Sequence, residues 1–133
     1  MNMKNPSVSI IIAVVVIGAI VLSGQGKKSS STAGIEISNN VKIIDGKQVI
    51  TINAKGGYSP KLTTARAGKP TTIKMVTNGA FDCSTSLVIP SLDYRKNLPQ
   101  TGEVEIPVPS QESGTKLRGL CSMGMYNFEV RFN

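Results

Sequence analysis

The sequence predicts an all-β domain over residues 35–133, a sandwich of about seven or eight short strands. Apolar residues in this region alternate with polar ones, which is the period of a β-strand with one buried face. Gly, Pro and Asn interrupt the pattern roughly every eight to twelve residues, and no long helical spacing occurs. Short strands separated by such regular turn signals are typical of a β-sandwich.

The first predicted strands form a hairpin. Residues 41–44 and 48–52 are apolar-rich segments on either side of Asp45-Gly46, a dipeptide that strongly favours a two-residue hairpin turn. A strand over residues 71–77 follows the turn Gly68-Lys69-Pro70 and alternates through Ile73 and Met75. We therefore expect Met75 to lie in the core of the domain.

Two further strands are predicted near the end of the chain. Residues 104–108 alternate with period two, and Pro107 and Pro109 place this strand at a sheet edge, because proline cannot donate to a strand ladder. The last strand carries its large apolar residues on one face: Phe128, Val130 and Phe132. A domain of this size buries only about two thirds of its unfolded surface. A disulfide or a metal would therefore help to stabilise it.

The chain begins with an apolar segment, and we expect residues 1–23 to form an N-terminal transmembrane helix. Val8 to Leu22 contains no charge, and the sequence after it fits a signal-peptide cleavage site poorly, although a cleaved signal peptide is the alternative. We therefore expect a single-pass protein of the cell membrane. Lys4 on one side is nearly balanced by Lys27 and Lys28 on the other, so the membrane side of the domain is undetermined. We expect residues 24–34 to form a flexible Gly/Ser/Lys linker.

Composition excludes several classes of function. The chain has 15 Lys and Arg against 8 Asp and Glu, and it has no histidine. Without histidine there is no Ser-His-Asp or Cys-His catalysis, no imidazole zinc site and no blue-copper electron-transfer centre. The lysines are scattered and have no aromatic residues between them, so we expect no nucleic-acid partner. Asp82 and the other charges are interpreted as surface residues, and the protein as not an enzyme.

Four sulfur atoms form the strongest candidate site. Cys121, Met123 and Met125 alternate in a segment with Gly124, and Cys83 follows the turn signal Asn78-Gly79. In a sandwich the two loops can meet at one end. Thiolates and thioethers are soft donors that favour Cu(I), whereas zinc usually takes four Cys or His ligands and Ca²⁺ takes oxygen. The set therefore selects Cu(I).

A second interpretation of the same residues remains open. Two cysteines in an exported β-domain commonly form a disulfide, which would make this a non-metal surface domain stapled by Cys83–Cys121. Met125 could then fill a gap in the core. Tyr58 and Tyr126 could shield a copper ion from water or serve only in packing.

Residues 56–132 resemble a known family, the EfeO-type cupredoxin-like domains, which include membrane-anchored bacterial Cu(I) chaperones of the CupA-like type. The matching segments occur in the expected order: Gly57-Tyr58-Ser59-Pro60, Ala67-Gly68-Lys69-Pro70, Cys83 with Val88-Ile89-Pro90, Leu98-Pro99, and Cys121-Ser122-Met123-Gly124-Met125. The resemblance implies a cupredoxin-like Greek-key β-sandwich. It also implies that Cys83, Cys121, Met123 and Met125 are the copper ligands.

The resemblance also implies a function in copper homeostasis and resistance. Anchored relatives act as copper chaperones or buffers that pass Cu(I) to a copper-exporting P-type ATPase. Some relatives bind two coppers through further methionines, but Met75 is the only other methionine of this domain. The sequence therefore leaves open whether the domain binds one copper ion or two.

Overall fold

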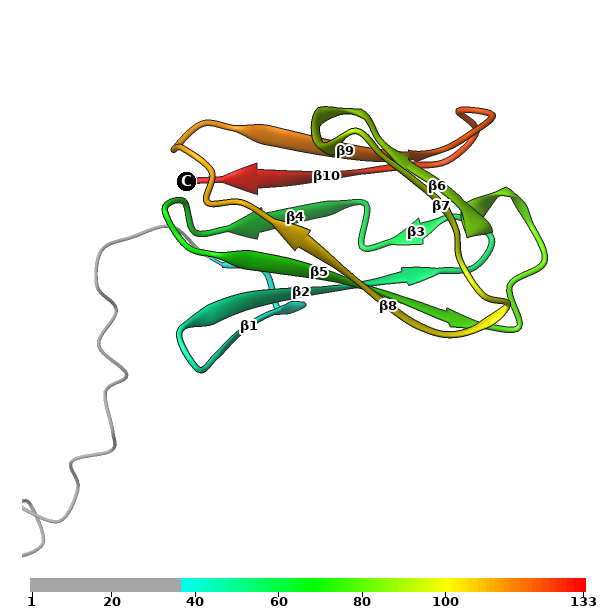
Figure 1. Ribbon diagram of the computed structural model, residues 1–133, viewed down its shortest axis with the longest axis horizontal. Helices are drawn as coiled ribbons and strands as arrows, with labels where there is room; N and C mark the ends of the chain where they lie inside the picture. Colours follow the sequence, from blue (N-terminus) through cyan, green and yellow to red (C-terminus); the bar gives the residue numbers. More distant parts are fainter. Residues whose placement is uncertain (1–36) are drawn as a thin grey trace, which may run out of the picture. The chain divides into compact units, whose positions relative to one another are not determined.

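Ten β-strands form two five-stranded sheets in the computed structural model, which describes residues 37–133. The sheets are stacked face to face, as Figure 1 shows. This confirms the predicted all-β sandwich, although the strands are more numerous than the seven or eight expected. The predicted membrane segment (1–23) and linker (24–34) lie outside the described residues. Within residues 37–133, no helix is long and apolar enough to cross a membrane.

The first sheet has the strand order β1-β2-β5-β8, and β3 pairs with β2. Strands β2 and β5 are parallel, whereas β1, β3 and β8 each pair antiparallel with their neighbour. The bounds are Val41–Ile44 for β1, Lys47–Ala54 for β2, Tyr58–Ser59 for β3, Thr71–Asn78 for β5 and Thr101–Val108 for β8.

The second sheet has the strand order β4-β10-β9-β6-β7. Its one parallel pair is β4 with β10. The bounds are Leu62–Ala65 for β4, Ser86–Ile89 for β6, Tyr94–Asn97 for β7, Lys116–Cys121 for β9 and Asn127–Phe132 for β10. Two short 3₁₀ helices flank β6: η1, Cys83–Thr85, and η2, Pro90–Leu92.

The local predictions are confirmed. Strands β1 and β2 form the hairpin, with Ile44 opposite Lys47 and both turn residues at positive φ, Asp45 at 50° and Gly46 at 76°. The proline-containing strand β8 lies at the end of the first sheet, as its prolines predicted.

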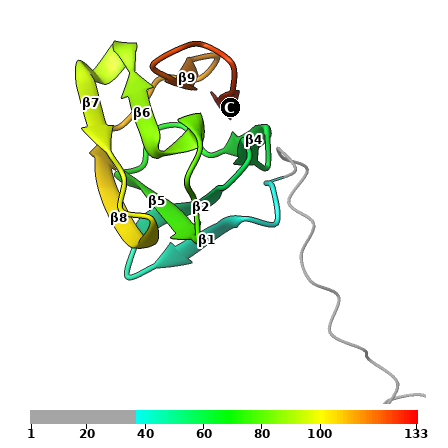
Figure 2. The same cartoon turned by 90° about the vertical axis from the view of Figure 1, so that its right-hand side faces the viewer.

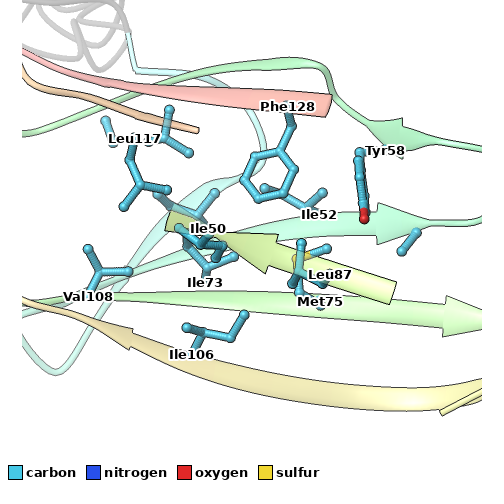
Figure 3. Close-up of a cluster of buried hydrophobic side chains, with 14 of the residues drawn as sticks. Ile50, Ile52, Tyr58, Ile73, Met75, Leu87, Ile106, Val108, Leu117 and Phe128 are labelled. Atoms are coloured by element: carbon cyan, nitrogen blue, oxygen red, sulfur yellow. The ribbon is translucent and has the colours of Figure 1, made fainter. Parts of the chain in front are cut away.

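The core lies between the two sheets and is built from the alternating residues of both (Figure 3). Met75 of β5 is 1% exposed, so it belongs to the core as predicted. The three apolar residues of β10 are buried on the same face. Burial of this apolar surface is the main driving force for the fold, and it fixes which face of each strand points to the core.

Candidate metal centre

Cys83 lies in η1, and Asp82 fixes the position of this helix. The Asp82 Oδ1 accepts a hydrogen bond from the Ser84 backbone N–H at 2.8 Å, and Oδ2 accepts one from the Gly56 N–H at 2.8 Å. Hydrogen bonds from Ser84 first, and then from Gly56, lower the pKa of the Asp82 carboxyl. One carboxylate thus connects η1 to the loop between β2 and β3.

This positioning role of Asp82 was missed in the sequence, where it was interpreted only as a surface charge. The available signal was an aspartate directly before Cys83-Ser84-Thr85, since Asp is a preferred residue at helix N-termini. Gly56, which Asp82 contacts, lies 26 residues away in the sequence, and no residue near Asp82 indicates this contact.

Tyr58 supports η1 from the core. Its hydroxyl donates to the Ser84 carbonyl oxygen at 3.0 Å, and its ring meets Phe128 edge to face with the centroids 5.2 Å apart. Burial, and to a lesser degree the negative charge of Asp82, raise the pKa of Tyr58 to about 12. Tyr58 is 3% exposed, so it acts in packing rather than as a surface shield.

Cys121 ends β9 and is completely buried. Its N–H donates to the Tyr126 carbonyl at 3.0 Å, and its own carbonyl accepts from the Gly124 N–H at 2.8 Å. These bonds close the loop from Ser122 to Tyr126, in which Gly124 takes a positive φ of 73° that glycine adopts without strain. Figure 2 views the sandwich from the end that carries this β9–β10 loop.

The structure brings the two cysteines together. Strand β6 follows η1 directly and pairs with β9, where Leu87 lies opposite Cys121 and the Ser122 N–H donates to the Ser86 carbonyl at 2.8 Å. The Cα atoms of Cys83 and Cys121 are 5.8 Å apart, and the two residues form a disulfide. The predicted meeting of the two loops at one end of the sandwich is therefore found.

The two methionines lie in the loop that follows Cys121, and both are exposed. The exposed fraction is 77% for Met123 and 65% for Met125. Met125 lines a hollow of about 220 Å³ beside Tyr126, whose ring packs over Gly57. Thus the methionines share the cysteines' end of the sandwich but lie at its surface, and a metal site built from all four residues stays a prediction.

The donor chemistry at this end suits a soft ion. Within residues 37–133, no three Cys, Asp or Glu side chains gather in a way that could hold a metal. What gathers there is sulfur: two cysteines in contact and two thioethers on the adjoining loop. In the reduced state the cysteines can supply thiolates, and such a set fits Cu(I) better than zinc or an oxygen-seeking cation.

Comparison with known proteins agrees with this fold. The family "Cupredoxin-like domain" matches residues 11–130. A solved structure of the metal-binding domain of the Streptococcus pneumoniae D39 Cu(I)-exporting P-type ATPase CopA, with Cu(I), is similar with a TM-score of 0.61. It is 21% identical, and the match covers 70% of this chain and 92% of that domain.

A second similar structure is a copper binding protein in its apo form, with a TM-score of 0.62, 22% identity, and coverage of 70% of this chain and 94% of that one. Among curated proteins no match was found. The identities are low, so the two structures support the fold alone. Because the family match extends over most of its residues, the chain belongs to the cupredoxin-like domain family.

Proposed function

We propose that this protein is a membrane-tethered Cu(I)-binding protein that serves as a copper chaperone or buffer in copper homeostasis and resistance. The observation that carries the proposal is the contact between Cys83 and Cys121 at the same end of the sandwich as the loop bearing Met123 and Met125. The similar folds are those of a Cu(I)-bound domain and a copper binding protein, which supports copper as the cargo.

The proposed ligands are Cys83, Cys121, Met123 and Met125. Two thiolates and one Cu(I) carry a net charge of −1, which the basic excess of the domain tolerates. The thioethers are neutral and have no proton to lose, so only the cysteines make binding depend on pH. Binding and transfer of Cu(I) would need no catalysed reaction.

Transfer would proceed by ligand exchange. A thiolate of the acceptor attacks the copper, a shared intermediate forms, and the ion leaves with the acceptor as the cysteines of this protein are displaced. A copper-exporting P-type ATPase is the acceptor class we propose, because one of the similar domains belongs to such an exporter. The N-terminal anchor would keep the domain close to a membrane transporter and raise its local concentration there.

Competition for Cu(I) tests this function. The reduced full-length protein, in detergent, is titrated with Cu(I) against a chromophoric Cu(I) chelator. We expect tight binding by wild type, almost none by Cys83→Ser/Cys121→Ser, and weakened binding by Met123→Leu/Met125→Leu. Met75→Leu is the matched control, because Met75 is buried in the core and should not affect the affinity. Equal binding by wild type and the double-serine variant would refute the proposal.

The disulfide itself favours a second candidate, a non-metal surface domain stapled by Cys83–Cys121. The bond closes a loop with a sequence separation of 38 residues. Chain entropy then predicts that reduction lowers the free energy of unfolding by about 4 kcal/mol. A free-thiol count on protein from its native membrane, followed by reduction and titration with Cu(I), separates the two. Free or copper-bound thiols, or tight Cu(I) binding once the disulfide is reduced, support copper handling. Complete oxidation with no Cu(I) binding after reduction supports the non-metal domain.

A further inference from the structure

The proposed copper ligands occur here in an oxidised form. A thiolate binds metal, whereas the Cys83–Cys121 disulfide has given up two electrons relative to the dithiol and offers no thiolate. Met123 and Met125 lie outside the bond and keep their thioethers in both states. This end of the sandwich therefore has two chemical states that differ by two electrons and share the same exposed thioether loop.

Contacts that involve no sulfur atom hold the segments around both cysteines. Cys121 is fixed by the β9 ladder, and η1 is fixed by the Asp82 carboxylate and the Tyr58 hydroxyl. None of these hydrogen bonds involves a sulfur atom, so reduction of the disulfide breaks none of them directly. The two thiols thus stay within reach of each other, so the disulfide can form and break without refolding.

Cu(II) is the oxidant that fits this site. The whole chain has no histidine, the ligand that would stabilise Cu(II) in a protein of this kind, whereas its soft sulfur donors stabilise Cu(I). Ligands that prefer the reduced ion shift the Cu(II)/Cu(I) equilibrium towards reduction. A dithiol beside two thioethers therefore favours electron transfer to Cu(II).

We propose that the Cys83/Cys121 dithiol reduces Cu(II) to Cu(I), so that the protein accepts either form of copper and delivers only Cu(I). Two Cu(II) ions each gain one electron. The two thiols lose these electrons and release two protons to solvent, and the sulfur–sulfur bond forms. The thioethers of Met123 and Met125 are not consumed, so they remain as soft donors for the Cu(I) that forms. The proposal rests on the proposed function for its cargo.

Recovery of the dithiol needs a thiol reductant, and the structure indicates where it attacks. Cys121 is completely buried and Cys83 is only partly buried, so an incoming thiolate reaches the Cys83 sulfur and Cys121 leaves. A second thiolate of the reductant then resolves the mixed disulfide. A dithiol reductant therefore completes the cycle, with its own two thiols oxidised.

The test mixes fully reduced, full-length protein with Cu(II) sulfate without oxygen, in the presence of a Cu(I)-specific chromophoric chelator. We expect two Cu(I) ions and the loss of two thiols per chain, with a monomeric product that has lost two hydrogen atoms in mass. Cys83→Ser/Cys121→Ser should yield no Cu(I) above buffer. Met123→Leu/Met125→Leu should give the same two Cu(I) ions, but more slowly.

The outcome is separable from the test of Cu(I) binding. If reduced wild type binds Cu(I) tightly but keeps both thiols in excess Cu(II), this inference is wrong and the proposed function stands. If two Cu(I) ions form per chain but the reduced protein cannot compete with the chelator for Cu(I), reduction stands and the chaperone proposal fails. Cu(I) formation by the double-serine variant at the wild-type yield would also overturn the inference.

Discussion

Replacing Gly119 by alanine should destabilise the domain, because the added methyl group would overlap the ring of Phe128. Gly119 of β9 lies directly opposite Phe128 of β10, and both are buried. A Cβ atom at position 119 would lie 3.0 Å from the Phe128 Cδ1 and would overlap the outer atoms of the ring. The ring of Phe128 meets Tyr58, whose hydroxyl holds η1. A shift of the Phe128 ring would therefore displace Tyr58 and weaken the hydrogen bond that holds η1, the helix that contains Cys83.

The expected change in the free energy of unfolding is the difference between two opposing contributions. Overpacking of a well-filled core costs up to about 3 kcal/mol. Alanine also restricts the unfolded chain and favours the strand relative to glycine by about 1 kcal/mol. The net expectation is a loss of about 2 kcal/mol in the free energy of unfolding, measured by urea denaturation of the oxidised protein.

A double-mutant cycle decides whether the ring is the cause. Phe128→Leu shortens the side chain and should itself destabilise the core by leaving a cavity. In Gly119→Ala/Phe128→Leu the new methyl group enters the vacated space, so the loss should be smaller than the sum of the single losses. Additivity within about 0.5 kcal/mol would refute the proposed overlap. A Gly119→Ala protein as stable as wild type would refute it as well.

Two pH predictions follow from the groups that hold η1. The pKa of Tyr58 is about 12 in the folded protein and 10.0 unfolded, so the free energy of unfolding should be level below pH 10 and fall by about 2–3 kcal/mol towards pH 12. Tyr58→Phe should lack this fall in alkaline urea denaturation, and equal slopes would contradict the assignment. The pKa of Asp82 is lowered from 3.8, so its charge stabilises the fold above pH 3.8 and this gain is lost as pH falls through the folded pKa. Asp82→Asn should therefore be less stable than wild type at pH 6 and converge with it in acid, whereas a constant difference would show that the charge has no part.

Elements with a strong local signal were predictable from the sequence. The β1–β2 hairpin depends on Asp45-Gly46, and β10 depends on alternation of large apolar residues, so neighbouring residues suffice to specify both. The additional strands have no such signal. Strand β3 has two residues, β4 reads Leu-Thr-Thr-Ala, and β7 exposes most of its residues, so these strands form only because longer neighbours offer them hydrogen bonds.

Long-range polar contacts were also beyond prediction. Gln48 is completely buried, although its type is usually exposed. Its side-chain amide donates to the Arg66 carbonyl and to the Thr71 Oγ1, and its oxygen accepts from the Arg66 N–H at 2.9 Å. No residue near Gln48 in the sequence indicates that its hydrogen-bond partners lie 18 and 23 residues away. The same holds for the Asp82–Gly56 bond, which connects η1 to the loop between β2 and β3.

The burial of the four candidate ligands differs in a way that bears on copper transfer. Cys121 is completely buried and Cys83 is half-buried in η1, so their positions are set by the fold. Met123 and Met125 lie on a five-residue loop that is open to solvent. An ion bound by all four would thus have a fixed thiolate side and an exposed thioether side. Neutral thioethers attract Cu(I) less strongly than thiolates do, so an acceptor thiolate would displace the methionines first and reach the copper from the exposed side of the loop.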